Sequence, residues 1–324
     1  MNSTKPNKVL LVTTQCSTHA SRLEEELNSL GANYFRLNTD NPELSNLPQY
    51  SLNKSSLESW IKDNQRKRQN LSEFQTVWWD EVVPNPDIYR NMPYGKWAFL
   101  ETQKASDWIL SSLEAIYIND PIEIIRGSNK VKQLKRARDL GISIPKTLIT
   151  SEYGLLERFI ERETIYKPIS RPTEESVGED FVIYTNIVKK EEINPSSTEC
   201  KLSFFQRYVP KKYEIRTYVI GNDCLSTEIH SQKSERSKVD WRKYDIANTP
   251  YYPHQLPTEI SKKLIHLTKS FNLHYSAIDL ILTPEDEYLF LELNPQGMWL
   301  WIETLTGLPI TKKLANLLAF PQIS

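Results

Sequence analysis

In the stretch YLFLELN near the C-terminus, two sets of side chains alternate one by one. The residues of the first set are Leu289, Leu291 and Leu293, and those of the second are Tyr288, Phe290, Glu292 and Asn294. A period of two is typical of a β-strand, whose successive side chains point to opposite faces of the sheet. The pattern therefore predicts a strand that places Glu292 and Asn294 on one face and the leucines toward the core.

The preceding segment, AIDLILTPEDE, predicts the partner of this strand in a hairpin. AIDLIL is apolar and rich in β-formers, and PEDE is a turn cluster that contains proline. If PEDE is a four-residue loop, Thr283 lies opposite Tyr288 and Asp279 lies opposite Glu292. Carboxylates directly opposite in a ladder have Cβ atoms about 4.5–5.5 Å apart and repel each other.

A lysine, a protonated carboxyl group or a divalent cation would offset this repulsion. Mg²⁺ takes oxygen ligands from one or two carboxylates and completes its shell with water and phosphate oxygens. Asn294 offers a third oxygen from the same face as Glu292. The alternative is a solvated polar face of an edge hairpin, and the spacing alone does not separate it from a metal site.

A second charged face is predicted in the strand-like stretch YEIRTYV. Its alternation groups Glu214, Arg216 and Tyr218. If Gly221–Asp223 is a three-residue loop, Arg216 lies opposite Glu228 and Glu214 lies opposite His230 in the next strand. The stretch LSFFQRYVP before it is expected to form a hairpin with YEIRTYV. Two charged faces in one antiparallel sheet indicate a single active site.

The N-terminal part predicts a parallel α/β unit. KVLLVTT reads as a buried strand, THASRLEEELNSLG as an amphipathic helix that ends at Gly31, and NYFRLN as the next strand. A strand–helix–strand order favours a parallel sheet. The glycine pattern GxGxxG of dinucleotide-binding proteins is absent. Further along, Ser128 is expected to cap a basic helix that runs to Gly141.

Charge and cysteine content restrict the class of protein. The chain has 40 Lys and Arg against 41 Asp and Glu, so no nucleic-acid or membrane partner is expected. No apolar run approaches the roughly 18 residues of a membrane span. Cys16, Cys200 and Cys224 form no paired motif, which favours a reducing, cytoplasmic location. We expect Cys16 to be a small buried thiol rather than a nucleophile.

The order of these segments resembles the ATP-grasp ligase superfamily over nearly the whole chain. The segments are GISIPKTLIT, IYKP, FFQRYVPKKYEIRTYVIG, AIDLIL and LFLELNPQG. The resemblance implies an α/β protein in which an N-terminal parallel α/β domain (1–120) precedes two α+β domains with antiparallel sheets. These are a central lid domain (121–205) and a C-terminal catalytic domain (206–324), with ATP held between them.

Three further segments, EIHSQ, DWRKYD and ELNPQGMWLWIETLTGLPI, are similar to the microviridin-type, or graspetide, maturases. Microviridin ligases tend to carry arginines after a tryptophan-containing stretch of the N-terminal domain, whereas VWWDEVVP has Asp80 and Glu81 there. This departure suggests a different graspetide precursor.

The resemblance implies a macrocyclase that uses ATP and Mg²⁺, with two ions expected. It would phosphorylate Asp or Glu side chains of a ribosomal precursor peptide and join them to Ser or Thr hydroxyls as esters, or to a Lys amine as an amide. ADP and phosphate would be released, and the ester is favoured. A precursor with leader and core segments and a homodimeric enzyme are also implied.

The resemblance also implies roles for individual residues. Asp279, Glu292 and Asn294 would hold Mg²⁺. Lys167 and Lys130 would bind phosphates, with Lys132 as the rival of Lys130. The adenine hinge would consist of Gln206, Tyr208 and Val209, and Glu214 would bind ribose.

Arg216 and Lys167 are the expected catalytic residues, with Arg216 holding the acyl phosphate or the incoming carboxylate. The expected contacts to the core peptide are Arg216, His230, Gln232 and Arg242. Trp299 and Trp301 either wall the peptide site or belong to the core.

Two other functions fit the same sequence. One is a RimK-like ligase that adds amino acids to a protein or peptide, which differs in substrate but not in the ATP step. The other is a catalytically silent peptide-binding module. The presence of Asp279, Glu292, Asn294, Lys167 and Arg216 argues against the silent module.

Overall fold

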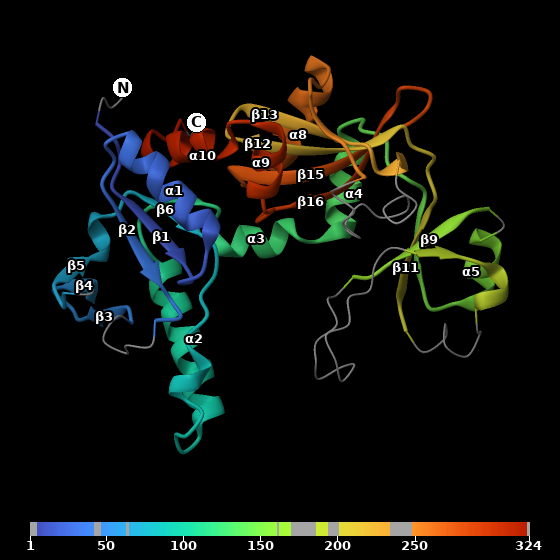
Figure 1. The fold of residues 1–324 in the computed structure, drawn as a ribbon. Helices are drawn as coiled ribbons and strands as arrows, with labels where there is room; N and C mark the ends of the chain where they lie inside the picture. Colours follow the sequence, from blue (N-terminus) through green and yellow to red (C-terminus); the bar gives the residue numbers. More distant parts are fainter. Residues whose placement is uncertain are drawn as a thin grey trace.

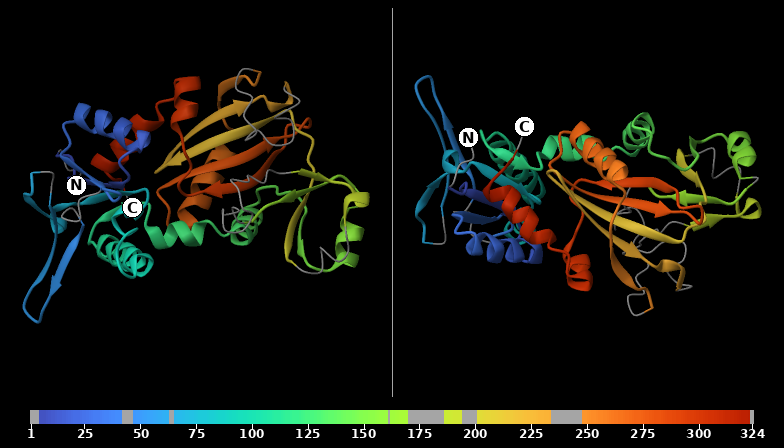
Figure 2. Two further views of the ribbon diagram at one scale, coloured as in Figure 1. Left: turned by 60° about the horizontal axis from the view of Figure 1, so that its bottom comes forward. Right: turned by 90° about the horizontal axis from the view of Figure 1, so that it is seen from above.

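The computed structural model describes residues 5–41, 47–62, 65–160, 162–169, 186–193, 201–233 and 248–322. Four β-sheets organise these residues. The N-terminal and C-terminal parts of the chain lie against each other, and the central sheet stands apart at the other end of the molecule (Figure 1, Figure 2). No helix in the described ranges is long and apolar enough to cross a membrane.

The N-terminal domain is built on a parallel sheet of order β2-β1-β6-β7, as the sequence predicts. Its strands are β1 (Val9–Thr13), β2 (Tyr34–Asn38), β6 (Thr76–Trp79) and β7 (Ile116–Ile118). Helix α1 (Thr18–Ser29) packs with α10 (Ile310–Ala319) on one face, and α2 (Gly95–Ser111) contributes to the core on the other. Gly31 follows α1 with φ +64, which confirms it as the end of that helix.

Smaller elements surround this sheet. A three-stranded antiparallel ribbon consists of β3 (Gln49–Leu52), β4 (Leu57–Lys62) and β5 (Arg68–Asn70). Short 3₁₀ helices are η2 (Leu71–Glu73) and η3 (Pro86–Ile88).

Two helices, α3 (Pro121–Gly127) and α4 (Lys130–Asp139), lead out of the N-terminal domain. Asp120 caps α3, and the Asn129 side chain accepts a hydrogen bond from the N–H of Lys132 to cap α4. The predicted cap Ser128 is wrong, because Ser128 ends α3 and donates its hydroxyl to the Ile124 carbonyl. The start of α4 is important because it places Lys130 at the first helical position.

The central sheet is antiparallel, with the order β10-β9-β11-β8. Its elements are β8 (Thr147–Thr150), α5 (Tyr153–Phe159), β9 (Thr164–Lys167), β10 (Asn186–Val188), η4 (Lys190–Glu192) and β11 (Ser203–Arg207). The expected hairpin between β11 and the next strand is wrong, because β11 pairs with β8 and β9 and the chain then crosses to another sheet. The expected domain boundary after residue 205 therefore lies inside β11.

The C-terminal sheet is antiparallel, with the order β14-β13-β12-β15-β16. Its strands are β12 (Tyr213–Ile220), β13 (Asp223–Ile229), β14 (Tyr251–His254), β15 (Tyr275–Leu282) and β16 (Tyr288–Asn294). Side chains of α4 and α8 (Thr258–Ser270) form one apolar core with Ile215 and Leu280 on one face. The opposite face carries the charged residues of the site, and η5 (Ser231–Lys233), α9 (Leu300–Thr306) and α10 complete the chain.

Candidate active site

The hairpin of β15 and β16 places Asp279 directly opposite Glu292, as the sequence predicts. The register near the turn is different, because Leu282 rather than Thr283 pairs with Tyr288. Leu280 pairs with Phe290 and Asp279 pairs with Glu292, so Leu291 is an extra residue in β16 between these two pairs. This β-bulge shifts the pairing by one residue and places Asp279 opposite Glu292.

This bulge also changes which side chains of β16 share a face. Phe290 pairs with Leu280 and is fully buried in the core beneath α8, together with Leu293. The sequence placed Phe290 on the face of Glu292 and all three leucines in the core. The structure instead leaves Leu291 half-buried, because an extra residue in one strand reverses the alternation.

Arg216 lies beside Asp279 on the neighbouring strand β12. Its Nη1 donates to Oδ1 and Oδ2 of Asp279 at 2.9 and 3.0 Å, and both side chains are buried. Burial lowers the pKa of Arg216, but the charge of Asp279 outweighs it, so the pKa is raised and the guanidinium stays charged. The site therefore contains a buried cation next to a carboxylate.

The predicted pairing of Arg216 with Glu228 is wrong. The turn between β12 and β13 consists of Gly221 and Asn222 alone, since Ile220 already pairs with Asp223. A loop one residue shorter than expected puts Arg216 opposite Thr227 and Glu228 opposite Ile215. Glu228 thus lies on the other face of the sheet.

Lys130 reaches the second carboxylate of the hairpin. Its Nζ is 2.8 Å from Oε2 of Glu292, whereas the rival Lys132 is exposed. Asn294 extends the same face, with its Nδ2 3.5 Å from Oδ2 of Asp279. Lys130 and Arg216 therefore offset the repulsion between Asp279 and Glu292 in this structure.

The donor set fits a hard cation. Two facing carboxylates and one amide oxygen are ligands that Mg²⁺ prefers, and such a site leaves positions for water and phosphate. No cluster of three or more His, Cys, Asp or Glu side chains that could hold a metal ion occurs in the described ranges.

The loop after β16 packs directly on Arg216, a contact that the alternation of the strands does not predict. The Tyr218 hydroxyl donates to the Met298 carbonyl at 2.9 Å, and the Tyr275 hydroxyl donates to the Gly297 carbonyl. Asn119 donates to the Pro295 carbonyl at 2.8 Å. The Nε of Arg216 is 3.4 Å from the Tyr218 hydroxyl, so the same tyrosine contacts both the loop and the arginine.

The N-terminal domain also contacts this loop. Gln296 donates to the carbonyl of Asp80, and the backbone N–H of Trp299 donates to Nε2 of His19 at 3.3 Å. Burial lowers the pKa of His19, although Asp80 and Glu303 oppose the shift, so a neutral acceptor is favoured. Helix α1 and the residue that follows β6 thus help to hold the loop that packs on Arg216.

Glu214 is buried on the same face as Arg216, with both oxygens engaged. Lys211 donates to one oxygen and the Ser231 hydroxyl to the other. Burial raises the pKa of Glu214, and Lys211 opposes this effect. Its expected contact with ribose stays a prediction.

Two other expected ATP-binding residues share one face of the central sheet. Lys167 pairs with Phe204 and Gln206 with Ile165, so the side chains of Lys167 and Gln206 lie on the face away from α5. Oε1 of Gln206 is buried and has no hydrogen-bond partner among the described residues. In the expected hinge, the N–H of Tyr208 donates to the Glu163 carbonyl at 3.0 Å.

The other residues expected to contact the core peptide lie in different environments. His230 lies with Glu228, 2.8 Å from its carboxylate, and stacks on Tyr213 rather than facing Glu214. Gln232 follows in η5 and is half-buried. Arg242 lies outside the described residues. The contacts of these three side chains with a peptide stay predictions.

The two tryptophans after the hairpin of β15 and β16 differ in environment. Trp299 belongs to the core and donates its Nε1–H to Thr311 at 2.8 Å. Trp301 is half-buried and packs edge-on against Tyr251.

The expected burial of Cys16 is wrong, because this thiol is exposed after β1.

Comparison with known proteins agrees with this geometry. A family model described as the RimK-like ATP-grasp domain matches residues 127–318. A search of curated proteins found no significant match. A Chryseobacterium gregarium RiPP-associated ATP-grasp ligase, solved with ADP and a leader and core peptide, is 28% identical, with 96% of each chain covered and a TM-score of 0.88.

The macrocyclase MdnC from Microcystis aeruginosa MRC, solved with its precursor peptide MdnA, is 26% identical. That match has a TM-score of 0.81 and covers 96% of this chain and 98% of MdnC. The fold and the resemblance predicted from the sequence are thus confirmed. The protein belongs to the RimK-like ATP-grasp family and is an ADP-forming ATP-grasp ligase.

Proposed function

We propose that the chain is an ATP-dependent macrocyclase of ribosomal precursor peptides, working in the cytoplasm as a homodimer. The observation that carries this proposal is the match over 96% of both chains to a ligase solved with ADP, leader and core. That match extends over the N-terminal domain, which the RimK-like model does not cover. Binding energy from a domain remote from the reacting bond serves to position the core peptide.

The chemistry begins with transfer of the γ-phosphoryl group of ATP to an Asp or Glu side chain of the peptide, which gives an acyl phosphate and ADP. A Ser or Thr hydroxyl, or a Lys amine, then attacks the acyl carbon, phosphate leaves, and an ester or amide forms. Each bond costs one ATP and removes the elements of one water from the peptide. Ester formation is our preferred outcome.

Positioning and cations supply most of the catalysis in such a transfer. We propose that Arg216 binds the acyl phosphate, because its planar guanidinium matches phosphate oxygens. Mg²⁺ bound by Asp279, Glu292 and Asn294 would neutralise charge on the ATP phosphates, with two ions expected. Lys130 lies next to Glu292 and is therefore placed to bind the same phosphates.

For the nucleotide base, the buried Oε1 of Gln206 would accept a hydrogen bond from the adenine amino group. The N–H of Tyr208 already donates to the Glu163 carbonyl, so this N–H would not read the adenine ring. Lys167 shares the face of Gln206 and would bind phosphate. Glu214, with Lys211 and Ser231 around it, is proposed for the ribose hydroxyls.

The proposed function is tested by incubating the full-length enzyme with Mg-ATP and the precursor peptide encoded beside its gene. Mass spectrometry is expected to show loss of one water per bond, with matching ADP release. The leaderless core peptide is expected to react much more slowly than the whole precursor. Equal rates would contradict a role for the leader, and a gain of amino-acid residues in mass would support the RimK-like alternative instead.

Lys130 and Lys132 provide a matched test of the nucleotide site. We expect Lys130→Ala to weaken Mg-ATP binding by about tenfold or more, since the ammonium lies beside Glu292. Lys132→Ala should bind ATP like the wild type, because this side chain is exposed. Calorimetry measures both, and EDTA should abolish binding by either variant. Undiminished affinity in EDTA would contradict the metal assignment.

A further inference from the structure

The outer face of α2 carries three large apolar side chains that are exposed. Trp97 is 64% exposed, Leu100 is 51% exposed and Trp108 is 67% exposed. The helix runs along the N-terminal domain, and its first turns extend beyond the parallel sheet (Figure 1). Exposed tryptophans gathered on one helix face are typical of protein interfaces.

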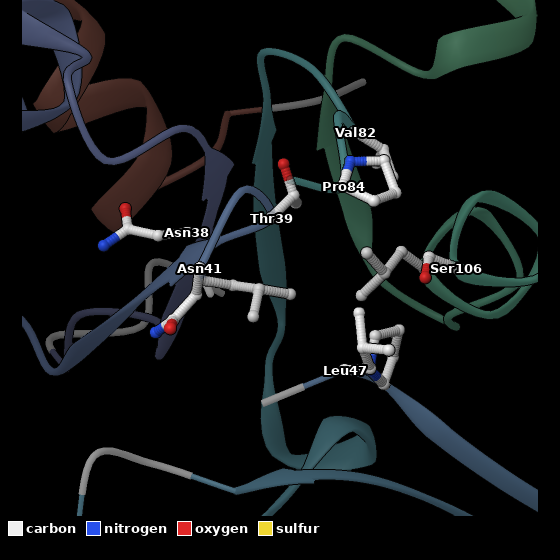
Figure 3. Close-up of a pocket in the computed structure, with 10 residues that line it drawn as sticks. Asn38, Thr39, Asn41, Leu47, Val82, Pro84 and Ser106 are labelled. Atoms are coloured by element: carbon white, nitrogen blue, oxygen red, sulfur yellow. The ribbon is translucent and has the colours of Figure 1, made fainter. Parts of the chain in front are cut away.

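The inner face of the same helix is already packed. Leu110 is fully buried in the core of the parallel sheet, and Ser106 is buried. Between this face and Thr39, Leu47 and Val82 lies only a narrow pocket of about 10 Å³ (Figure 3). This volume is at the lower limit for one water molecule. The helix is thus anchored on one side and presents its tryptophans on the other.

The exposed face has the spacing of a coiled-coil seam. Trp97, Glu101, Lys104 and Trp108 follow one another at intervals of four, three and four residues, and all four are exposed. This spacing keeps the side chains on a single stripe of the helix. The stripe places one acidic and one basic residue between two tryptophans, with Leu100 beside it.

We propose that α2 pairs antiparallel with α2 of a second copy of this chain, about a two-fold axis that passes between Thr102 and Gln103. Trp97 then meets the partner's Trp108, and Glu101 meets the partner's Lys104. Because the axis repeats each contact, the stripe is complementary to itself, as a two-fold interface requires. This surface gives the expected homodimer a defined site.

The charges also select the orientation of the two helices. In a parallel pair with the same stripe, Glu101 would face the partner's Glu101, and Lys104 would face the partner's Lys104. Like charges facing each other oppose association, whereas the antiparallel pair contains two attractive contacts. The order of the four residues thus favours the antiparallel dimer.

Charge reversal on the full-length protein tests this interface. Sedimentation equilibrium should show a wild-type dimer, and Glu101→Lys and Lys104→Glu should each raise the dimer dissociation constant by about tenfold or more. An equimolar mixture of the two variants should associate again as a heterodimer, because each reversed charge then meets its opposite. Lys96→Glu is the matched control, since Lys96 is exposed on the same helix but outside the stripe.

Circular dichroism should show that every variant is folded, because the replaced side chains are exposed. A wild-type chain that remains monomeric at all concentrations would overturn the proposal. A dimer that neither reversal weakens would also overturn it, because the two copies would then meet through another surface. Failure of the mixed variants to associate would exclude the antiparallel register.

Discussion

Replacing Arg216 with alanine is expected to reduce turnover by about a hundredfold or more, the cost of losing one donor to a developing negative charge. The same change should lower the free energy of unfolding of the metal-free protein by about 3–5 kcal/mol, because Asp279 is left buried without its partner. Affinity for Mg-ATP should be maintained, since the Asp279 oxygens become available to the cation. Peptide-dependent ADP release, calorimetry and denaturant unfolding measure the three effects.

Arg216→Lys separates structural support from catalysis. Lysine restores a positive charge beside Asp279 but lacks the planar fork that matches phosphate oxygens, so it should recover stability more than turnover. Arg136→Ala is the control, because Arg136 is half-buried, donates to the Ser270 carbonyl and stacks on Phe271 away from the site. Normal turnover by Arg216→Ala would show that the arginine only balances Asp279, and the proposed acyl-phosphate site would be wrong.

The charged hairpin could be predicted from the sequence because local alternation and a short turn define it. Even so, the predicted pairing of Asp279 with Glu292 is right only because two differences from the expected register cancel. The turn is one residue longer than expected, and the bulge in β16 restores the register. A bulge has no reliable signal in YLFLELN, so the burial of Phe290 could not be read from the alternation.

Contacts between segments that are far apart in the sequence could not be predicted from local patterns of residues. Arg216 and Asp279 are 63 residues apart, and no turn length relates β12 to β15. A turn one residue shorter than assumed was enough to assign Arg216 to Glu228. The contacts of Tyr218, Tyr275 and Asn119 with the loop after β16 likewise require the three-dimensional arrangement.

Replacement of Gly297 in that loop is expected to be damaging, because the residue packs closely against Ala277 and Arg216. A methyl group at this position would overlap Cβ of Ala277 and lie 2.7 Å from Nη2 of Arg216. The loop or the arginine must therefore move, and a displacement of about 1 Å at a catalytic group can cost about a hundredfold in rate. Gly297→Ala is thus expected to reduce turnover by about a hundredfold, while far-ultraviolet circular dichroism stays that of the wild type.

A second substitution identifies the cause of such a loss. Ala277→Gly removes the methyl group that Gly297→Ala would overlap, so the double variant should recover much of the turnover if that overlap displaces the loop. Gly154→Ala in α5 is the matched control, because an added methyl group there meets no atom within 4 Å. If Gly297→Ala turned over peptide normally, close packing of this loop on Arg216 would be unnecessary for catalysis. If Gly297→Ala were slow and the double variant turned over normally, the overlap with Ala277 would be the cause, and the loop would act by holding the guanidinium of Arg216 in place.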